Sequence, residues 1–129
     1  MTPADNLSLS RREHLIVGAM WALLAALFIL LNRNAIASMS LPDSDDYLRL
    51  QQVRDWLAGQ NWFDVTQHRI NPPDGGILHW SRLVDLPIAG LIVALRPLLG
   101  DRLAEIVACV AVPPLTLLAM CLALYASVK

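Results

Sequence analysis

Three long apolar runs separated by polar residues constrain this chain more than any other feature. They cover residues 15–31, 86–99 and 106–128. The first run has 17 residues and would extend about 26 Å as a helix, close to the roughly 30 Å hydrocarbon core of a bilayer. The third has 23 residues and is long enough to cross, whereas the second reaches bilayer length only if it begins near Leu83. We therefore expect an all-α, polytopic transmembrane protein with about three spans.

The composition supports a membrane protein and excludes other classes. Hydrophobic residues make up 56% of the 129 residues, above the roughly 45–50% of soluble domains. The formal net charge is −1, and no basic patch with interleaved aromatic residues is present, so we expect no nucleic-acid partner. Cys109 and Cys121 lie in one apolar run, about 18 Å apart along a helix, which is too far for a disulfide within that helix.

The basic residues predict the orientation of the spans. Arg11 and Arg12 precede the first run, and the positive-inside rule then places the N-terminus in the cytoplasm. We expect a multi-pass protein of the bacterial inner (plasma) membrane. Its predicted segments are a cytoplasmic leader at 1–13 (disordered over residues 1–10), a first span at 14–32, an external loop at 33–82, a second span at 83–99, a cytoplasmic turn at 100–105 and a third span at 106–128. Pro113 and Pro114 predict a kink in the third span.

A secretory signal peptide is the alternative interpretation of the N-terminal region. Two arginines, an apolar stretch and Ala35-Ile36-Ala37 before Ser38 resemble such a signal, with cleavage after Ala37. The apolar run is longer than the usual core of roughly 7–15 residues, and further apolar runs follow it. Retention as a membrane helix is therefore the favoured interpretation.

The long polar loop contains one amphipathic helix, predicted at 43–58. Pro42 precedes it, Asp43 or Ser44 can cap it, and Gly59 stands where helices commonly end. Apolar side chains recur in it at helical spacing, at Tyr47, Leu50, Val53 and Leu57, with Trp56 beside them. Further along the loop, residues 71–76 (Asn-Pro-Pro-Asp-Gly-Gly) indicate a turn.

Three carboxylates, those of Asp43, Asp45 and Asp46, stand within four positions at the start of this helix. Carboxylates in a first turn cap free backbone amides and favour the positive end of the helix dipole. A divalent cation site is the second interpretation, because Mg²⁺ and Mn²⁺ prefer carboxylate oxygen and take one or two protein carboxylates together with phosphate oxygens. Arg49 and Arg54 would then clamp phosphate oxygens.

The first span, the external acidic motif and three later segments resemble the GT-C membrane glycosyltransferases. Within these, the chain is most similar to the catalytic subunits of oligosaccharyltransferases and their uncharacterised bacterial relatives. The resemblance is carried by Asp45-Asp46-Tyr47, by the segment 54–59 (Arg-Asp-Trp-Leu-Ala-Gly), by the turn at 71–76 and by Trp80. Leu48 stands where the family usually has a second aromatic residue.

The resemblance implies that Asp45 is the catalytic, metal-binding aspartate, assisted by Asp43. It implies transfer of a sugar from a polyprenyl-phosphate-linked donor, at the outer membrane face, to a protein, lipid or glycan acceptor. It covers the first three of roughly a dozen spans. We therefore expect the native chain to continue beyond these 129 residues, and the segment alone to be inactive.

A non-catalytic membrane protein is the competing function. In that case the acidic helix is only capped and solvated, and the chain acts as an assembly partner of another membrane protein. His68 and His79 are weaker candidates for metal ligands, since they are eleven positions apart across a Pro/Gly turn without a matched zinc-ligand spacing. Ordinary loop polarity accounts for both.

Overall fold

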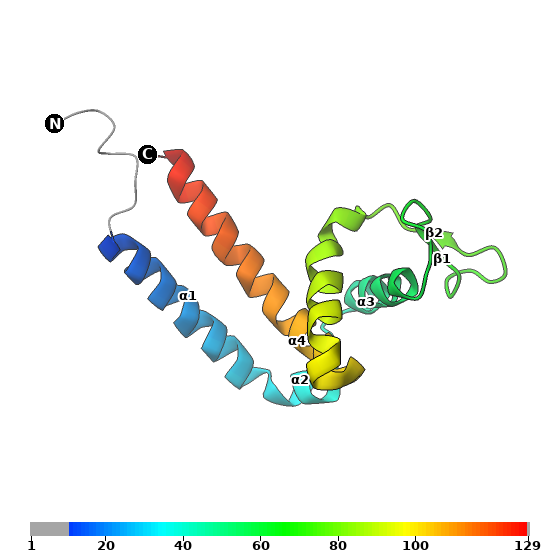
Figure 1. Cartoon of the computed structure of the whole chain (residues 1–129), viewed down its shortest axis with the longest axis horizontal. Coiled ribbons are helices and arrows are strands. Elements are labelled where there is room, and N and C mark those ends of the chain that lie inside the picture. The colour runs from blue at the N-terminus through cyan, green and yellow to red at the C-terminus, as the bar shows by residue number, and fades with distance from the viewer. Residues whose placement is uncertain (1–10, 129) are drawn as a thin grey trace.

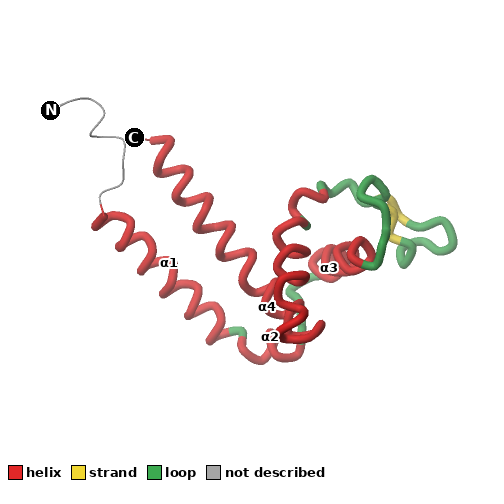
Figure 2. Tube along the Cα trace, viewed as in Figure 1, coloured by secondary structure: helices red, strands yellow, loops and turns green. Residues whose placement is uncertain are grey.

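The computed structural model describes residues 11–128 and is mostly helical, as predicted (Figures 1 and 2). The predicted disordered leader therefore falls largely outside the described residues. The elements in chain order are α1 (Arg11–Leu31), α2 (Arg33–Ser38), α3 (Ser44–Leu57), β1 (Thr66–Gln67), β2 (Gly76–Ile77), the 3-10 helix η2 (Arg82–Val84) and α4 (Leu86–Val128). The two short strands pair antiparallel, with Thr66 opposite Ile77 and Gln67 opposite Gly76.

Gly100 folds α4 back on itself. Its backbone has φ 76° and ψ 169°, a conformation that glycine adopts without the steric penalty other residues meet. The helix thus consists of a first arm (residues 86–99) and a second arm (residues 101–128), which diverge from the turn (Figure 1). The non-helical residue inside α4 is Gly100, whereas Pro113 and Pro114, where a kink is predicted, lie within the helix. The fixed φ of proline is compatible with a helix, although its missing N–H and the clash of its ring with the preceding turn both weaken one.

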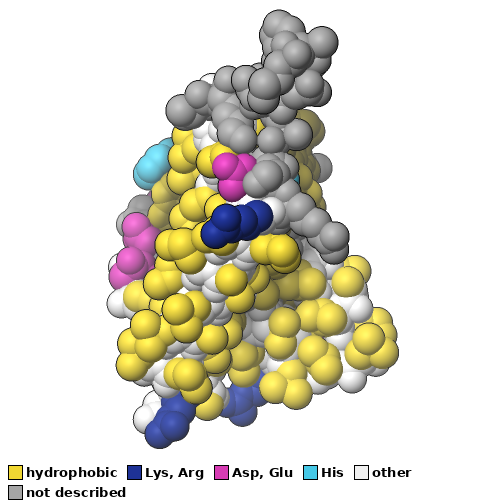
Figure 3. Space-filling model, turned by 90° about the vertical axis from the view of Figure 1, so that its left-hand side faces the viewer, with side chains coloured by type: hydrophobic (Ala, Val, Ile, Leu, Met, Phe, Trp, Pro, Cys, Tyr) yellow, Lys and Arg dark blue, Asp and Glu magenta, His cyan; other side chains and the backbone are white. Residues whose placement is uncertain are grey.

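Two helices are long and apolar enough to cross a membrane: α1 over Arg12–Leu31, and the segment Arg82–Ser127 that contains α4. Their apolar windows are 0% and 6% buried, unlike the core helix of a soluble protein. Figure 3 shows hydrophobic side chains over most of the described part of the face that α1 and the second arm of α4 present. The predicted all-α class is therefore confirmed, with two helices long and apolar enough to span a membrane.

The lengths of the two arms decide how α4 can meet a bilayer. The second arm extends about 42 Å at 1.5 Å per residue, and the first arm only about 21 Å. A hydrocarbon core is roughly 30 Å thick. The second arm is therefore long enough to cross, and the first arm is too short.

The part of α4 that follows Gly100 lies beside α2, the short helix after α1 (Figure 1). The guanidinium of Arg102 donates to the carbonyl oxygen of Ala37 in α2, 3.3 Å away. This arrangement differs from the predicted one, in which residues 100–105 and the loop 33–82 faced opposite sides of the membrane. The reason is that the first arm starts beside the loop and returns to the end of α1 rather than running away from it.

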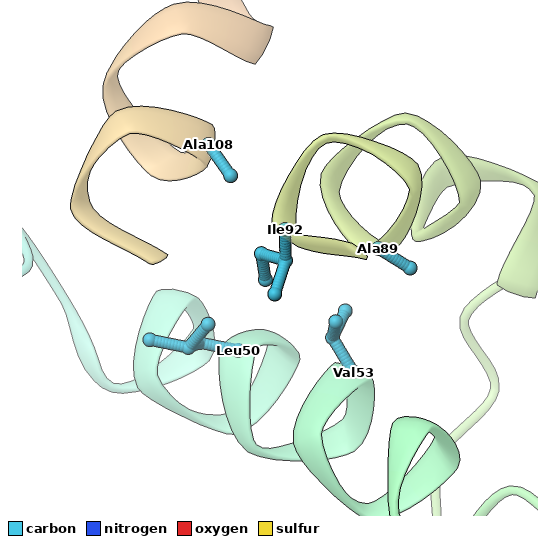
Figure 4. Close-up of a cluster of buried hydrophobic side chains, with 5 residues drawn as sticks. All are labelled: Leu50, Val53, Ala89, Ile92 and Ala108. Atoms are coloured by element: carbon cyan, nitrogen blue, oxygen red, sulfur yellow. The ribbon is translucent and has the colours of Figure 1, made fainter. Parts of the chain in front are cut away.

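A small apolar core joins α3 to both arms of α4. Leu50 and Val53 of α3 meet Ala89 and Ile92 of the first arm and Ala108 of the second (Figure 4). Val53, Ile92 and Ala108 are fully buried. The alanines allow α3 to approach the helix backbones closely. The apolar stripe predicted for residues 43–58 is thus the face by which α3 packs.

Candidate functional site

Asp43 is the N-cap of α3. One of its carboxylate oxygens, Oδ1, accepts hydrogen bonds from the backbone N–H groups of Asp45, at 2.9 Å, and Asp46, at 3.0 Å. These amides belong to the first turn, where the helix offers them no carbonyl partner. For Asp43, the capping interpretation of the acidic cluster is therefore observed directly.

The carboxylates of Asp45 and Asp46 point outward instead. Both residues are exposed, and within residues 11–128 neither carboxylate takes part in a hydrogen bond or ion pair. They stand beside each other on the first turn, where the helix dipole favours negative charge. Two solvent-facing carboxylates therefore remain available for a cation.

Arg49 is paired with a buried carboxylate. Its NH1 lies 2.9 Å from Oδ1 of Asp85, which is fully buried at the entrance of α4. The same guanidinium lies 4.9 Å from the centre of the Trp80 ring, within the range of a cation–π contact. Arg49 thereby connects α3 to the segment before α4.

Arg54 is paired with Glu105 through two parallel hydrogen bonds. Nε donates to Oε1 at 2.8 Å and NH2 donates to Oε2 at 2.6 Å. The hydrogen bonds to Glu105 raise the pKa of Arg54, against the opposing effect of partial burial. Both arginines expected to bind phosphate are therefore engaged with carboxylates of the chain, and both connect α3 to α4.

Arg82 and Asp85 are the polar residues that the sequence analysis missed. Arg82 is 4% exposed. Its guanidinium donates to the backbone carbonyls of Trp62 and Asp64 and to the side chain of Gln60. These hydrogen bonds hold the loop that follows α3 against η2. The sequence did carry a signal for these two residues. They are opposite charges three positions apart at the start of an apolar run, and charges there need either a hydrogen-bonding partner or contact with solvent.

A polar cleft of about 390 Å³ lies between the end of α3 and the β1–β2 hairpin, lined by Asp55, Gln60, His68 and Arg69. Burial acts to raise the pKa of Asp55, but hydrogen bonds from Gln67, Gln51 and Arg69 outweigh it and hold that pKa below its ordinary value. Asp55 is therefore ionised at neutral pH.

The two histidines lie in different surroundings. His68 lines the polar cleft, whereas His79 lies beside Trp80, with ring centroids 6.2 Å apart. In the described part of the chain, no group of three or more His, Cys, Asp or Glu side chains is arranged to hold a metal ion. A site at Asp45 and Asp46 would thus offer two carboxylates. That number suits Mg²⁺ or Mn²⁺ bound together with water and phosphate oxygens, and it does not suit a cage built from protein groups alone.

Comparisons of this chain with family models, with curated proteins and with solved structures found no match.

Proposed function

We propose that this chain is the N-terminal membrane module of a GT-C type glycosyltransferase, which transfers a sugar from a polyprenyl-phosphate-linked donor at the outer membrane face. The observation that carries the proposal is the pair of exposed carboxylates of Asp45 and Asp46. They lie in the first turn of α3, which comes after α1 and α2 in the chain, and α1 is long and apolar enough to cross a membrane. The resemblance assigns the catalytic position to Asp45.

The three aspartates at the start of α3 and its two arginines have distinct roles in this proposal. Asp45 and Asp46 would hold Mg²⁺ or Mn²⁺, and such a cation supplies neutralisation of negative charge on a phosphate leaving group. Asp43 fixes the first turn that carries them, through its two hydrogen bonds to their amides. Arg49 and Arg54 keep α3 in place through their ion pairs. They position the helix rather than contact the donor.

The proposed topology has two spans rather than three. α1 and the second arm of α4 cross the membrane, with the N-terminus in the cytoplasm of a bacterial inner membrane. The first arm, too short to cross, lies at the outer interface together with α3. This places the Gly100 turn outside, on the side of the acidic residues, in accord with the contact between Arg102 and Ala37.

A non-catalytic assembly partner is the second candidate function. One observation favours it: Asp43, Arg49, Arg54 and Asp55 are all engaged within the fold. A helix whose charges chiefly hold its own structure together needs no substrate to explain them. Asp45 and Asp46 then distinguish the two functions, because only the enzyme requires them.

Sugar transfer in native membranes tests the proposal. The protein is expressed from its own gene with Asp45→Asn, and transfer from a radiolabelled polyprenyl-phosphate sugar is measured. We expect a loss of roughly 10²-fold or more, typical of removing a group that stabilises charge in the transition state. Asp74→Asn, which changes an exposed loop carboxylate, is the matched control and retains transfer. Undiminished transfer in Asp45→Asn would exclude the catalytic role, and cross-linking to a membrane partner would then favour the assembly function.

Direct metal binding provides the second measurement. Mn²⁺ titrated into the membrane-embedded chain is followed by electron paramagnetic resonance. Asp45→Asn and Asp46→Asn are expected to weaken Mn²⁺ binding, whereas Asp74→Asn leaves it unchanged. Equal binding by all these variants would remove the cation from the proposal.

A further inference from the structure

The polar cleft lined by Asp55, Gln60, His68 and Arg69 is the second distinctive feature of the loop. Its volume of about 390 Å³ falls within the range of roughly 300–1,000 Å³ typical of small-molecule sites. The methylene stems of the lining side chains provide apolar surface, and their polar ends provide donors and acceptors. A ligand that fits this lining has both C–H faces and polar groups.

A buried glutamine holds the cleft in shape. Gln67 is 1% exposed. Its Nε2 donates to Oδ2 of Asp55 at 3.1 Å, and its Oε1 accepts from the backbone N–H of Arg69 at 3.2 Å. Gln51 donates to the other oxygen of Asp55 at 2.8 Å. The carboxylate and the start of the Arg69 side chain are therefore positioned before any ligand arrives.

Arg69 retains hydrogen-bonding capacity. Its NH1 donates to both carboxylate oxygens of Asp55, at 3.1 and 2.8 Å. Within residues 11–128, its Nε and NH2 groups make no hydrogen bond. The side chain is 61% exposed, and the neighbouring His68 is also exposed. Guanidinium and imidazole groups thus face solvent at the rim of a preformed cleft.

The charge of the cleft selects the class of ligand. The positive charge of Arg69 is compensated by Asp55, 2.8 Å away, so this pair contributes no net charge to the lining. A phosphate or carboxylate would gain from Arg69 and be repelled by Asp55. A neutral hydroxyl-rich molecule can donate to the carboxylate and accept from Arg69 and His68 at once.

We propose that this cleft binds a neutral sugar unit, held between Asp55, His68 and Arg69. The inference rests on the proposed glycosyltransferase function and deepens it, because it assigns sugar recognition to residues separate from the carboxylates of Asp45 and Asp46. Gln67 holds Asp55 in place by its hydrogen bond, and Gln60 lines the cleft. Gln60 donates to the carbonyl of Thr66 at 2.8 Å and accepts from Arg82 at 3.2 Å.

Saturation-transfer NMR on the whole chain in phospholipid nanodiscs tests this site. Nanodiscs avoid glycoside detergents, which would compete as ligands. The probes are the methyl glycosides of glucose, N-acetylglucosamine and N-acetylgalactosamine at millimolar concentration, with inorganic phosphate as the anionic probe. His68→Ala and Arg69→Gln are the test variants. Arg96→Gln is the matched control, because Arg96 is an exposed arginine paired with Asp101.

We expect at least one glycoside to bind, and each test variant to weaken it about tenfold, the equivalent of about 1.4 kcal/mol. Arg96→Gln should bind like the unmodified chain. No glycoside binding, or binding that survives both test variants, would overturn the sugar site. So would phosphate binding that is tighter than glycoside binding and depends on Arg69. Since Asp45→Asn tests transfer separately, failure of the cleft and failure of the proposed function give different results.

Discussion

Arg54 and Glu105, 51 positions apart in the chain, form a two-point ion pair with N–O distances of 2.8 and 2.6 Å. Arg54 belongs to α3 in the polar loop, and Glu105 stands just beyond the Gly100 turn of α4. Because the loop begins where α1 ends, the pair brings the turn to that same end of α1. It joins two segments that the sequence analysis assigned to opposite faces of a membrane.

Cysteine labelling tests this placement. In a chain with Cys109 and Cys121 replaced by alanine, single cysteines are introduced as Asp74→Cys in the loop and Asp101→Cys in the turn, both at exposed positions. We expect a membrane-impermeant maleimide to label both from the same side of sealed vesicles. A third variant, Ser127→Cys at the far end of α4, should be labelled from the other side. Labelling of Ser127→Cys from the same side as Asp74→Cys, with Asp101→Cys labelled only from the opposite side, would restore the three-span topology.

The ion pair between Arg49 and Asp85 should dominate the stability of the loop. The side chain of Asp85 is 0% exposed. Arg49→Met therefore leaves a buried carboxylate without its paired cation. Breaking such a pair costs roughly 3–5 kcal/mol of unfolding free energy. The measurement is unfolding by sodium dodecyl sulfate in mixed micelles, followed by tryptophan fluorescence.

Two further variants make the Arg49 experiment decisive. Arg96→Met removes an exposed partner of Asp101 and should change the unfolding free energy by no more than about 1 kcal/mol. The double variant Arg49→Met with Asp85→Asn should recover part of the loss, because it removes the uncompensated charge. If Arg49→Met and Arg96→Met proved equally mild, the burial of Asp85 would have no energetic consequence.

The three aspartates of the acidic cluster should differ in their effect on stability. Asp43→Ala removes the cap of α3 and should lower the unfolding free energy by about 1 kcal/mol, within the range of 0.5–2 kcal/mol for N-caps. Asp45→Ala and Asp46→Ala change exposed side chains and should stay within roughly 0.5 kcal/mol. Chemical denaturation of the three variants side by side measures the difference. Equal losses for all three would contradict the division between a capping residue and two free carboxylates.

Acid should lower the stability of the fold around the polar cleft by protonating Asp55. Burial raises the pKa of Asp55, but the hydrogen bonds from Gln67, Gln51 and Arg69 outweigh burial and lower this pKa below its ordinary value of 3.8. The stabilisation is therefore present above pH 3.8 and is lost as the pH falls through the pKa of the folded state. Asp55→Asn should be less stable than the unmodified chain near neutral pH, with a difference that narrows below pH 3.8.

Unfolding midpoints measured across the acid range check the Asp55 prediction. Asp101→Asn is the control, since the side chain of Asp101 is 76% exposed and its replacement should change the unfolding midpoints little. A constant difference between Asp55→Asn and the unmodified chain at every pH would mean that Asp55 acts by packing rather than by its charge.

Local patterns predicted the elements of this fold well. The helix expected at 43–58 is α3 at Ser44–Leu57, begun by Asp43 as cap and ended by Gly59 at φ 111°. Its apolar stripe packs through Leu50 and Val53 as expected. The first apolar run is α1. Each of these features depends on residues within a few positions of one another, and capping and periodicity describe such relationships directly.

Long-range pairings were beyond sequence reasoning. The charges of Arg49 and Arg54 suited a phosphate as well as a carboxylate, and nothing in their neighbourhood named Asp85 or Glu105 as partners, 36 and 51 positions away. The buried Arg82 likewise looked like an ordinary loop residue. Its charge beside an apolar run could indicate that it needs partners, but two of those partners are the backbone carbonyls of Trp62 and Asp64, which no residue type could identify.

The sequence by itself therefore determined the helical, apolar character of the chain and the cap of α3, because hydrophobicity, length and capping act locally. The tertiary structure decided the fold-back at Gly100, the partners of the arginines and the shape of the polar cleft. Turn direction and ion pairing depend on which distant segments approach one another. That approach follows from the packing of α3 between the two arms of α4, and not from any single stretch of residues.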